Sequence, residues 1–151
     1  MPDLLVDITD GVGTLTMNRP DARNALSLEM RSGMHEFLDK YEFDDSVRCV
    51  VITGAGDHFM AGGDVKSFAG MAKEKSSEEM RTHFLHRIHN LHGFISAMRR
   101  FPKPIIASTR GAVAGAGVSL AAACDLIIAS DDSFYTLAYC HIGISPDGGS
   151  T

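Results

Sequence analysis

The 151 residues of the chain, 44% hydrophobic and 22% charged, are enough for one domain with a buried core. A formal net charge of -5 without a basic block argues against nucleic acid as the main partner. No apolar run is long enough to cross a membrane, and the N-terminus lacks the basic flank and apolar stretch of a signal peptide.

The three cysteines, Cys49, Cys124 and Cys140, are widely spaced and set among apolar residues. Neither a disulfide framework nor the CxxC spacing of a metal site fits this pattern. We therefore expect reduced core thiols in a cytoplasmic protein.

The first third of the chain predicts a hairpin followed by a helix. Two apolar runs, residues 4–8 and 12–17, flank Asp10-Gly11, which supplies the positive φ angles of a tight turn. A polar loop covers residues 18–25, and a helix begins near Ser27, a favourable cap. The apolar residues of this segment recur at helical spacing: Leu26, Met30, Met34, Phe37, Leu38 and Tyr41.

The middle of the chain predicts a buried strand, a loop and a long helix. The strand covers residues 48–53, and the loop over residues 54–64 is rich in small residues. Residues 71–75 are expected to form a surface linker or a loose helix end. Ser76 and Glu79 then make a capping box. The long helix carries one apolar stripe and stops at two prolines: Met80, Phe84, Ile88, Leu91, Ile95 and Met98, then Pro102 and Pro104.

The last third predicts strands around a glycine-rich centre. A strand over residues 105–109 leads into the glycine-rich turn within residues 111–120 and then into a buried helix. A second buried strand covers residues 125–129, and residues 133–138 are expected to form another. Because strands and helices alternate along the chain without a domain boundary, the fold class is α/β.

Two patterns in the glycine-rich centre suggest other chemistries. The run Gly115-Ala-Gly117-Val-Ser-Leu120 lacks the third glycine of a dinucleotide-binding fingerprint, and the crossover to the next strand is short. Around Ser119 the sequence approximates the nucleophile elbow of serine hydrolases, but no acid lies in a plausible triad loop before His141. We favour Ser119 as a small residue at a tight turn.

Four histidines of the long helix, at positions 83, 86, 89 and 92, recur every three residues. Because each step turns the helix by about 300°, the histidines spiral around it and do not line one face. No flanking Cys, Asp or Glu completes a metal site, so a solvated helix flank is the favoured interpretation and no metal is expected.

Two loops of small residues, 61–64 and 115–117, offer backbone N–H groups that a ligand can approach, and the second precedes a helix N-terminus. Taken singly, each loop fits close backbone packing. Asp147 lies in a third glycine-rich turn. Together the three segments fit one task, in which two N–H groups polarise a carbonyl and a carboxylate moves a proton.

These segments resemble the crotonase superfamily, the enoyl-CoA hydratase/isomerase family. The matching segments follow the family's order along the whole chain: residues 17–20, 23–26, 51–54, 59–66, 103–107, 111–125 and 142–151. The resemblance implies a crotonase-like spiral of repeated β-β-α units and an acyl-CoA substrate. Coenzyme A is therefore expected as part of the substrate, with no separate cofactor.

The resemblance assigns the thioester carbonyl to the N–H groups of Gly63 and Ala116, and the catalytic carboxylate to Asp147. It implies that coenzyme A lies along residues 23–25 and 61–66, with Arg23 and Lys66 as cations and Lys73 and Lys75 as further candidates. The substrate-binding residues that it implies are Arg23, Ala25, Ala61, Gly62, Asp64, Lys66, Ser119 and Tyr139.

Hydratases of this family use two glutamates, and the corresponding positions here are Ser119 and Tyr139. Neither side chain is an ordinary general base, so double-bond isomerisation with Asp147 as the proton shuttle is favoured over hydration. Thioester hydrolysis, displacement on an aromatic acyl-CoA of the dehalogenase type, and a non-catalytic acyl-CoA-binding subunit stay open.

Family chains continue well beyond residue 151, in segments that serve oligomer contacts and cover coenzyme A. The resemblance therefore implies that residues 1–151 are the N-terminal core domain, either as a fragment of a longer protein or as a truncated product. It also implies a role in fatty acid metabolism and, for a complete chain, assembly into a homotrimer or hexamer. The net charge and the lack of a long apolar run lead us to expect no nucleic-acid or membrane partner.

Overall fold

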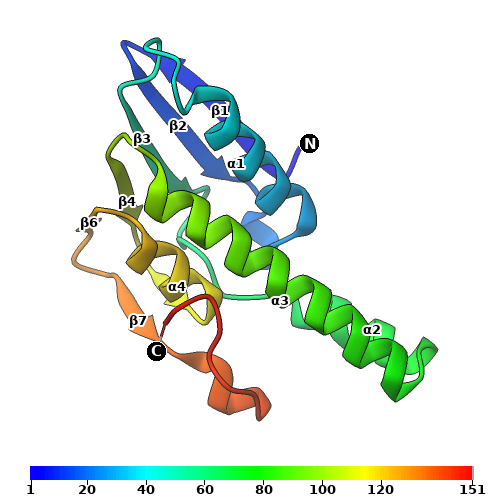
Figure 1. The fold of residues 1–151 in the computed structure, drawn as a ribbon. Helices are drawn as coiled ribbons and strands as arrows, with labels where there is room; N and C mark the ends of the chain where they lie inside the picture. Colours follow the sequence, from blue (N-terminus) through cyan, green and yellow to red (C-terminus); the bar gives the residue numbers. More distant parts are fainter. Residues whose placement is uncertain (151) are drawn as a thin grey trace.

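In the computed structural model, which describes residues 1–150 apart from the side chains of residues 67 and 72, helices lie over one face of a five-stranded sheet (Figure 1). The strand order is β1-β2-β3-β4-β6. The β1–β2 hairpin is antiparallel, and the remaining neighbours run parallel. These strands are β1 (Leu4–Thr9), β2 (Val12–Met17), β3 (Cys49–Gly54), β4 (Ile105–Thr109) and β6 (Leu126–Ala129).

The three central strands show why this sheet forms. Burial alternates residue by residue along β2, β3 and β4, which is the period of a pleated strand with one apolar face. Leu15, Ile52 and Ala107 are among the fully buried residues of that face. The predicted strands over these segments are confirmed.

Helices α1 (Leu28–Tyr41) and α3 (Ser77–Arg100) begin at the predicted caps. The Ser27 hydroxyl accepts the N–H of Met30 at 3.1 Å. At α3, the N–H of Glu79 donates to the Ser76 hydroxyl at 3.3 Å, and the N–H of Ser76 donates to Glu79 Oε2 at 2.8 Å. At each N-terminus, a side chain close in sequence therefore accepts one of the free N–H groups of the first turn.

Helix α2 (Val65–Glu74) was not predicted as a separate helix. Residues 71–74 are its C-terminal end, so of the two interpretations of this segment the linker is wrong and the helix end is correct. The Phe68 ring packs edge-on against Phe84 of α3 with centroids 5.0 Å apart, and a tertiary contact of this kind stabilises a helix of only 10 residues, which is too short to be stable alone. α2 and the adjoining end of α3 extend beyond the sheet (Figure 1).

A second, two-stranded parallel sheet pairs β5 (Ala112–Ala114) with β7 (Phe134–Thr136). Met60 forms a bridge to Val113 and so extends this sheet by one residue of the preceding loop. Helix α4 (Ala116–Ala123) follows β5, and the short helix η2 (Ala138–Ile142) follows β7. The orders β4-β5-α4 and β6-β7-η2 are successive turns of a β-β-α spiral, the architecture that the resemblance implied.

Strand β6 departs from its prediction as a buried strand, because all four of its residues are exposed. Leu126 and Ile128 are 59% and 64% exposed. β6 is the last strand of the sheet, and within residues 1–150 no strand pairs with its outer edge. An apolar run alone does not distinguish a strand in the sheet interior from one at the edge.

The cysteines are buried to different degrees, so the expectation of three core thiols is wrong for two of them. Cys124 is buried, Cys49 is partly exposed and Cys140 is exposed. Burial raises the pKa of the Cys124 thiol to about 12, and its Sγ donates to the Leu120 carbonyl oxygen at 3.3 Å. This thiol is therefore protonated and unreactive at neutral pH.

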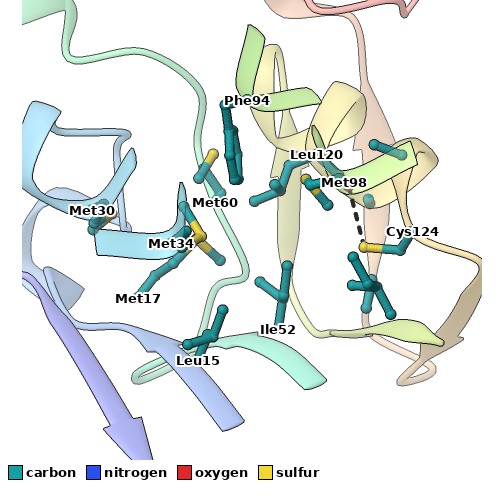
Figure 2. Packing of buried hydrophobic residues seen from close by; sticks show 14 of the residues in the cluster. Leu15, Met17, Met30, Met34, Ile52, Met60, Phe94, Met98, Leu120 and Cys124 are labelled. Atoms are coloured by element: carbon teal, nitrogen blue, oxygen red, sulfur yellow. Dashed lines mark hydrogen bonds between the residues drawn. The ribbon is translucent and has the colours of Figure 1, made fainter. Parts of the chain in front are cut away.

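The core lies between the sheet and α1, α3 and α4, and it is rich in methionine (Figure 2). Met30 and Met34 of α1 face Met17 and Leu15 of β2, while Met60 reaches the core from the loop after β3. Met60 is fully buried, so the chain is anchored to the core immediately before the small residues 61–64. Among residues 1–150, no helix has the length and hydropathy needed to cross a membrane.

Candidate active site

The two loops of small residues lie side by side. The N–H of Met60 donates to the Ala112 carbonyl at 3.1 Å, and the N–H of Ala114 donates back to the Met60 carbonyl at 2.8 Å. A Cβ built on Gly62 would lie 3.3 Å from the Ala114 carbonyl oxygen, so the backbones touch. Gly62 has a φ of +103°, a backbone conformation that residues with a Cβ rarely adopt, so glycine is the residue that fits here.

The N–H groups of Gly63 and Ala116 sit on these adjoining loops. Within residues 1–150, no protein acceptor takes a hydrogen bond from either N–H. Ala116 is the first residue of α4, so its N–H also carries the partial positive charge of a helix N-terminus. Both donors are thus available to a ligand oxygen, and their assignment to a thioester carbonyl stays a prediction.

Asp147, Tyr139 and Ser119 form a hydrogen-bonded cluster next to these loops. The Tyr139 hydroxyl donates to Asp147 Oδ1 at 2.7 Å, and the Ser119 hydroxyl donates to the Asp147 backbone carbonyl at 2.8 Å. The two hydroxyls are 3.4 Å apart. A Cβ at Gly115 would lie 4.0 Å from the Tyr139 ring, so the carboxylate cluster and the N-terminus of α4 adjoin.

Burial raises the pKa of Tyr139, and the hydrogen bond to Asp147 raises it further. The phenol therefore stays protonated at neutral pH and remains a hydrogen-bond donor. Ser119 is 1% exposed and has its hydroxyl committed to the Asp147 carbonyl, so the nucleophile-elbow interpretation has no general base beside this serine.

His92 is a member of this site that the sequence analysis did not identify. Its Nε2 accepts the N–H of Gly148, the residue after Asp147, at 3.3 Å. The contact joins positions 56 residues apart, and no local spacing signals it. The helix-flank interpretation is therefore incomplete for His92, and it is also wrong for His83, whose Nε2 is buried. Among residues 1–150, no group of three or more His, Cys, Asp or Glu side chains is arranged to hold a metal ion.

The residues expected along coenzyme A divide into two groups. Arg23, Lys66, Lys73 and Lys75 are exposed. By contrast, the Asp64 carboxylate pairs with Arg19 at 2.9 Å, and the same guanidinium donates to the Ala25 carbonyl at 2.8 Å. The N–H of Ala61 donates to the Arg23 carbonyl at 2.9 Å, which ties the two candidate segments together.

Asn24 lies in the segment 23–25 that was expected along coenzyme A, but its side chain binds the protein's own backbone. Its side chain is fully buried, accepts the N–H of Arg19 at 2.9 Å, and donates to the carbonyls of Ala55 and His58 at 2.9 and 2.7 Å. A positive φ of 54° also suits asparagine.

The substitution Asn24→Ala is expected to lower the free energy of unfolding by about 3 kcal/mol, because three partly buried backbone groups lose their partner. Equilibrium denaturation measures the change. Asn90→Ala on the exposed side of α3 is the control and should be nearly neutral; equal effects of the two substitutions would contradict the role of Asn24.

Gly117 sets how closely α4 approaches the loop after β3. A Cβ at this position would lie 2.5 Å from the Met60 carbonyl oxygen, which already accepts the N–H of Ala114. Gly117→Ala is expected to lower the free energy of unfolding by about 1–3 kcal/mol, since the backbone itself must shift.

The matched substitution is Gly93→Ala, at an exposed helical glycine with nothing within 4 Å of the new Cβ. It is expected to raise stability by about 0.5–1 kcal/mol through helix propensity. Thermal or urea unfolding of the two variants checks both signs; if Gly117→Ala is also stabilising, the close approach is wrong.

Comparison with known proteins gives this arrangement a family. A family model described as enoyl-CoA hydratase/isomerase matches residues 12–151, of which residue 151 lies outside the described part. A trans-2-decenoyl-acyl-carrier-protein isomerase of Streptococcus mutans is 35% identical over 148 residues, covering 97% of this chain and 54% of its own length. A 1,2-epoxyphenylacetyl-CoA isomerase of Escherichia coli is 34% identical over 155 residues, covering 100% and 56%.

A 4-chlorobenzoyl coenzyme A dehalogenase of Arthrobacter is also 34% identical, over 97% of this chain and 51% of its own length. Solved structures agree: an enoyl-CoA hydratase from Polaromonas superposes with a TM-score of 0.87 at 37% identity, over 97% of this chain and 55% of that one. The chain spans about half the length of the curated relatives it matches. By sequence and by fold, the chain belongs to the enoyl-CoA hydratase/isomerase family, the crotonase superfamily.

Proposed function

We propose that the full-length protein isomerises the double bond of an enoyl-CoA, with Asp147 as the proton shuttle and the N–H groups of Gly63 and Ala116 as the oxyanion hole. The observation that carries this proposal is the environment of Asp147. Asp147 is the carboxylate of the cluster. Its hydrogen-bonding partners, Ser119 and Tyr139, occupy the two positions where family hydratases hold glutamates.

Each step of the isomerisation needs only these groups. The Asp147 carboxylate removes a proton from the carbon between the thioester carbonyl and the double bond. The electron pair moves toward the thioester oxygen, and the resulting dienolate accepts hydrogen bonds from Gly63 and Ala116. The carboxyl group then returns the proton to the far end of the dienolate, so the atoms of product and substrate are the same.

Hydration is less well supported, because it needs one group to activate water and another to protonate the enolate. Ser119 donates its hydroxyl proton to a backbone carbonyl, and Tyr139 has a raised pKa, so neither side chain is a base at neutral pH. Isomerisation, by contrast, needs only one carboxylate, which first accepts a proton from the substrate and then returns it.

A second candidate is displacement of a halide from an aromatic acyl-CoA. Two observations favour it: the 34% identity to a 4-chlorobenzoyl coenzyme A dehalogenase, and the imidazole of His92 beside the Asp147 turn. In this reaction Asp147 attacks the ring carbon and the halide leaves. Water then hydrolyses the aryl ester, and His92 takes the proton of that water at Nε2, which must first release the Gly148 N–H.

The test uses the full-length protein with a panel of 3-enoyl-CoA thioesters and 4-chlorobenzoyl-CoA. Conversion of a 3-enoyl to a conjugated 2-enoyl thioester of the same mass, followed by absorbance and mass spectrometry, supports isomerisation. A product heavier by one water, free coenzyme A, or chloride release without isomerisation would overturn it in favour of hydration, thioester hydrolysis or dehalogenation.

The wider setting of this activity is part of the same proposal. Three predictions from the family resemblance belong to this proposal: an acyl-CoA thioester as the substrate, a role in fatty acid metabolism, and a homotrimeric or hexameric assembly. The cytoplasmic location is a prediction from the cysteine pattern. Size-exclusion chromatography with light scattering on the full-length protein measures the assembly directly.

A further inference from the structure

We propose that Tyr139 is a positioning residue that holds Asp147 by Oδ1, so that Oδ2 alone removes and returns the proton. The inference deepens the proposed function and rests on it. It assigns the Tyr139 side chain, first expected among the substrate-binding residues, a role that acts through Asp147.

The hydrogen bonds of the cluster fix which atom donates to which. A serine hydroxyl has one proton, and Ser119 must give it to the Asp147 backbone carbonyl at 2.8 Å, since a carbonyl only accepts. The Ser119 proton is therefore not shared with Tyr139. The Tyr139 hydroxyl donates its own proton over its shorter contact, which is to Asp147 Oδ1 at 2.7 Å. Within residues 1–150, no hydrogen bond engages Oδ2.

The peptide unit that follows Asp147 is held by other contacts. The carbonyl of Asp147 accepts from Ser119 and from the Ser150 hydroxyl at 3.0 Å, and the next N–H, of Gly148, donates to His92 at 3.3 Å. Gly148 has a φ of +61°, and a Cβ there would lie 2.9 Å from the Ser119 Cβ. With the main chain held, the hydrogen bond from Tyr139 is what limits rotation of the carboxyl group.

Tyr139 is suited to this task by its burial. It is 6% exposed, and its raised pKa keeps the phenol protonated over the neutral and mildly alkaline range. A hydrogen bond to an ionised carboxylate contributes more free energy than one between neutral groups. If the bond orients the carboxylate only for the chemical step, its loss lowers the rate by a factor of about 10–100.

The consequence for chemistry is retention of the transferred proton. When one oxygen carries the proton and the carboxyl group does not rotate, the proton returns to the substrate before it exchanges with water. A carboxyl group free to rotate presents its proton to solvent. A substrate deuterated at the donor carbon therefore reports on Tyr139 through the fraction of deuterium kept in the product.

The experiment compares Tyr139→Phe with Tyr135→Phe in the full-length protein. Tyr135 is the matched control, because its hydroxyl bonds to Thr109 at 2.8 Å, away from Asp147. Tyr139→Phe is expected to lower kcat about 10–100-fold with KM nearly unchanged, and to lower deuterium retention. Tyr135→Phe should change none of these. Unchanged kcat and retention in Tyr139→Phe would overturn the inference.

A second measurement does not depend on activity. The Tyr139 ring is followed by NMR over a pH titration and assigned with the Tyr139→Phe variant. Because the bond to Asp147 raises the pKa of Tyr139, Asp147→Asn should move its titration to lower pH. No movement would overturn the inference. If this shift is seen but the wild-type protein does not isomerise any substrate, the proposed function fails while the Tyr139–Asp147 contact stands.

Discussion

Asp147→Asn is expected to lower kcat for enoyl-CoA isomerisation by about 10²–10⁴-fold, the usual range for loss of a general acid–base group. The amide has nearly the shape of the carboxyl group and keeps an oxygen that accepts the Tyr139 hydroxyl, now 2.7 Å from Asp147 Oδ1. The amide cannot take a proton from carbon at neutral pH. Chemistry is therefore lost while the turn that carries residue 147 stays in place.

Steady-state kinetics on the substrate that the wild-type protein turns over measures this loss, and binding of the acyl-CoA product shows whether the pocket survives. Asp131→Asn is the control, because Asp131 is exposed in the turn after β6 and should leave kcat unchanged. Retention of near wild-type kcat by Asp147→Asn, with normal folding, would rule out Asp147 as the shuttle.

Ala116→Pro is expected to lower kcat by about 10²–10³-fold, the loss that follows removal of one oxyanion-hole donor. Proline has no backbone N–H, and Ala116 is the first residue of α4, where a helix accepts proline without losing an internal hydrogen bond. The substitution therefore removes the donor from a thioester oxygen and keeps the helix.

Leu28→Pro is the matched control, since Leu28 is the first residue of α1, is 50% exposed, and follows Ser27 in an extended conformation that suits a residue before proline. Both variants should unfold near the wild-type temperature, and only Ala116→Pro should lose activity. If Ala116→Pro is stable and fully active, the N–H of residue 116 does not hold the oxyanion.

Much of the fold follows from short-range patterns. The Asp10-Gly11 turn, the Ser27 cap and the Ser76–Glu79 capping box are each complete within four residues, so their energetics are local and the predictions from them are confirmed. The elements that were missed or assigned the wrong burial depend on distant partners. Helix α2 packs through Phe68 on Phe84, β5 pairs with β7, and β6 is exposed because it is an edge strand.

The candidate site divides in the same way. Sequence determined which residue types are present: the small residues at 61–64 and 115–117, the carboxylate at 147, and the absence of glutamates at 119 and 139. Only the tertiary structure decided that Asp64 pairs with Arg19, that Asn24 ties down three backbone groups, and that Tyr139 and His92 meet the Asp147 turn. Turns and caps are fixed by neighbours along the chain, whereas a side chain's hydrogen-bond partner is fixed by packing between segments far apart in sequence, which no local pattern encodes.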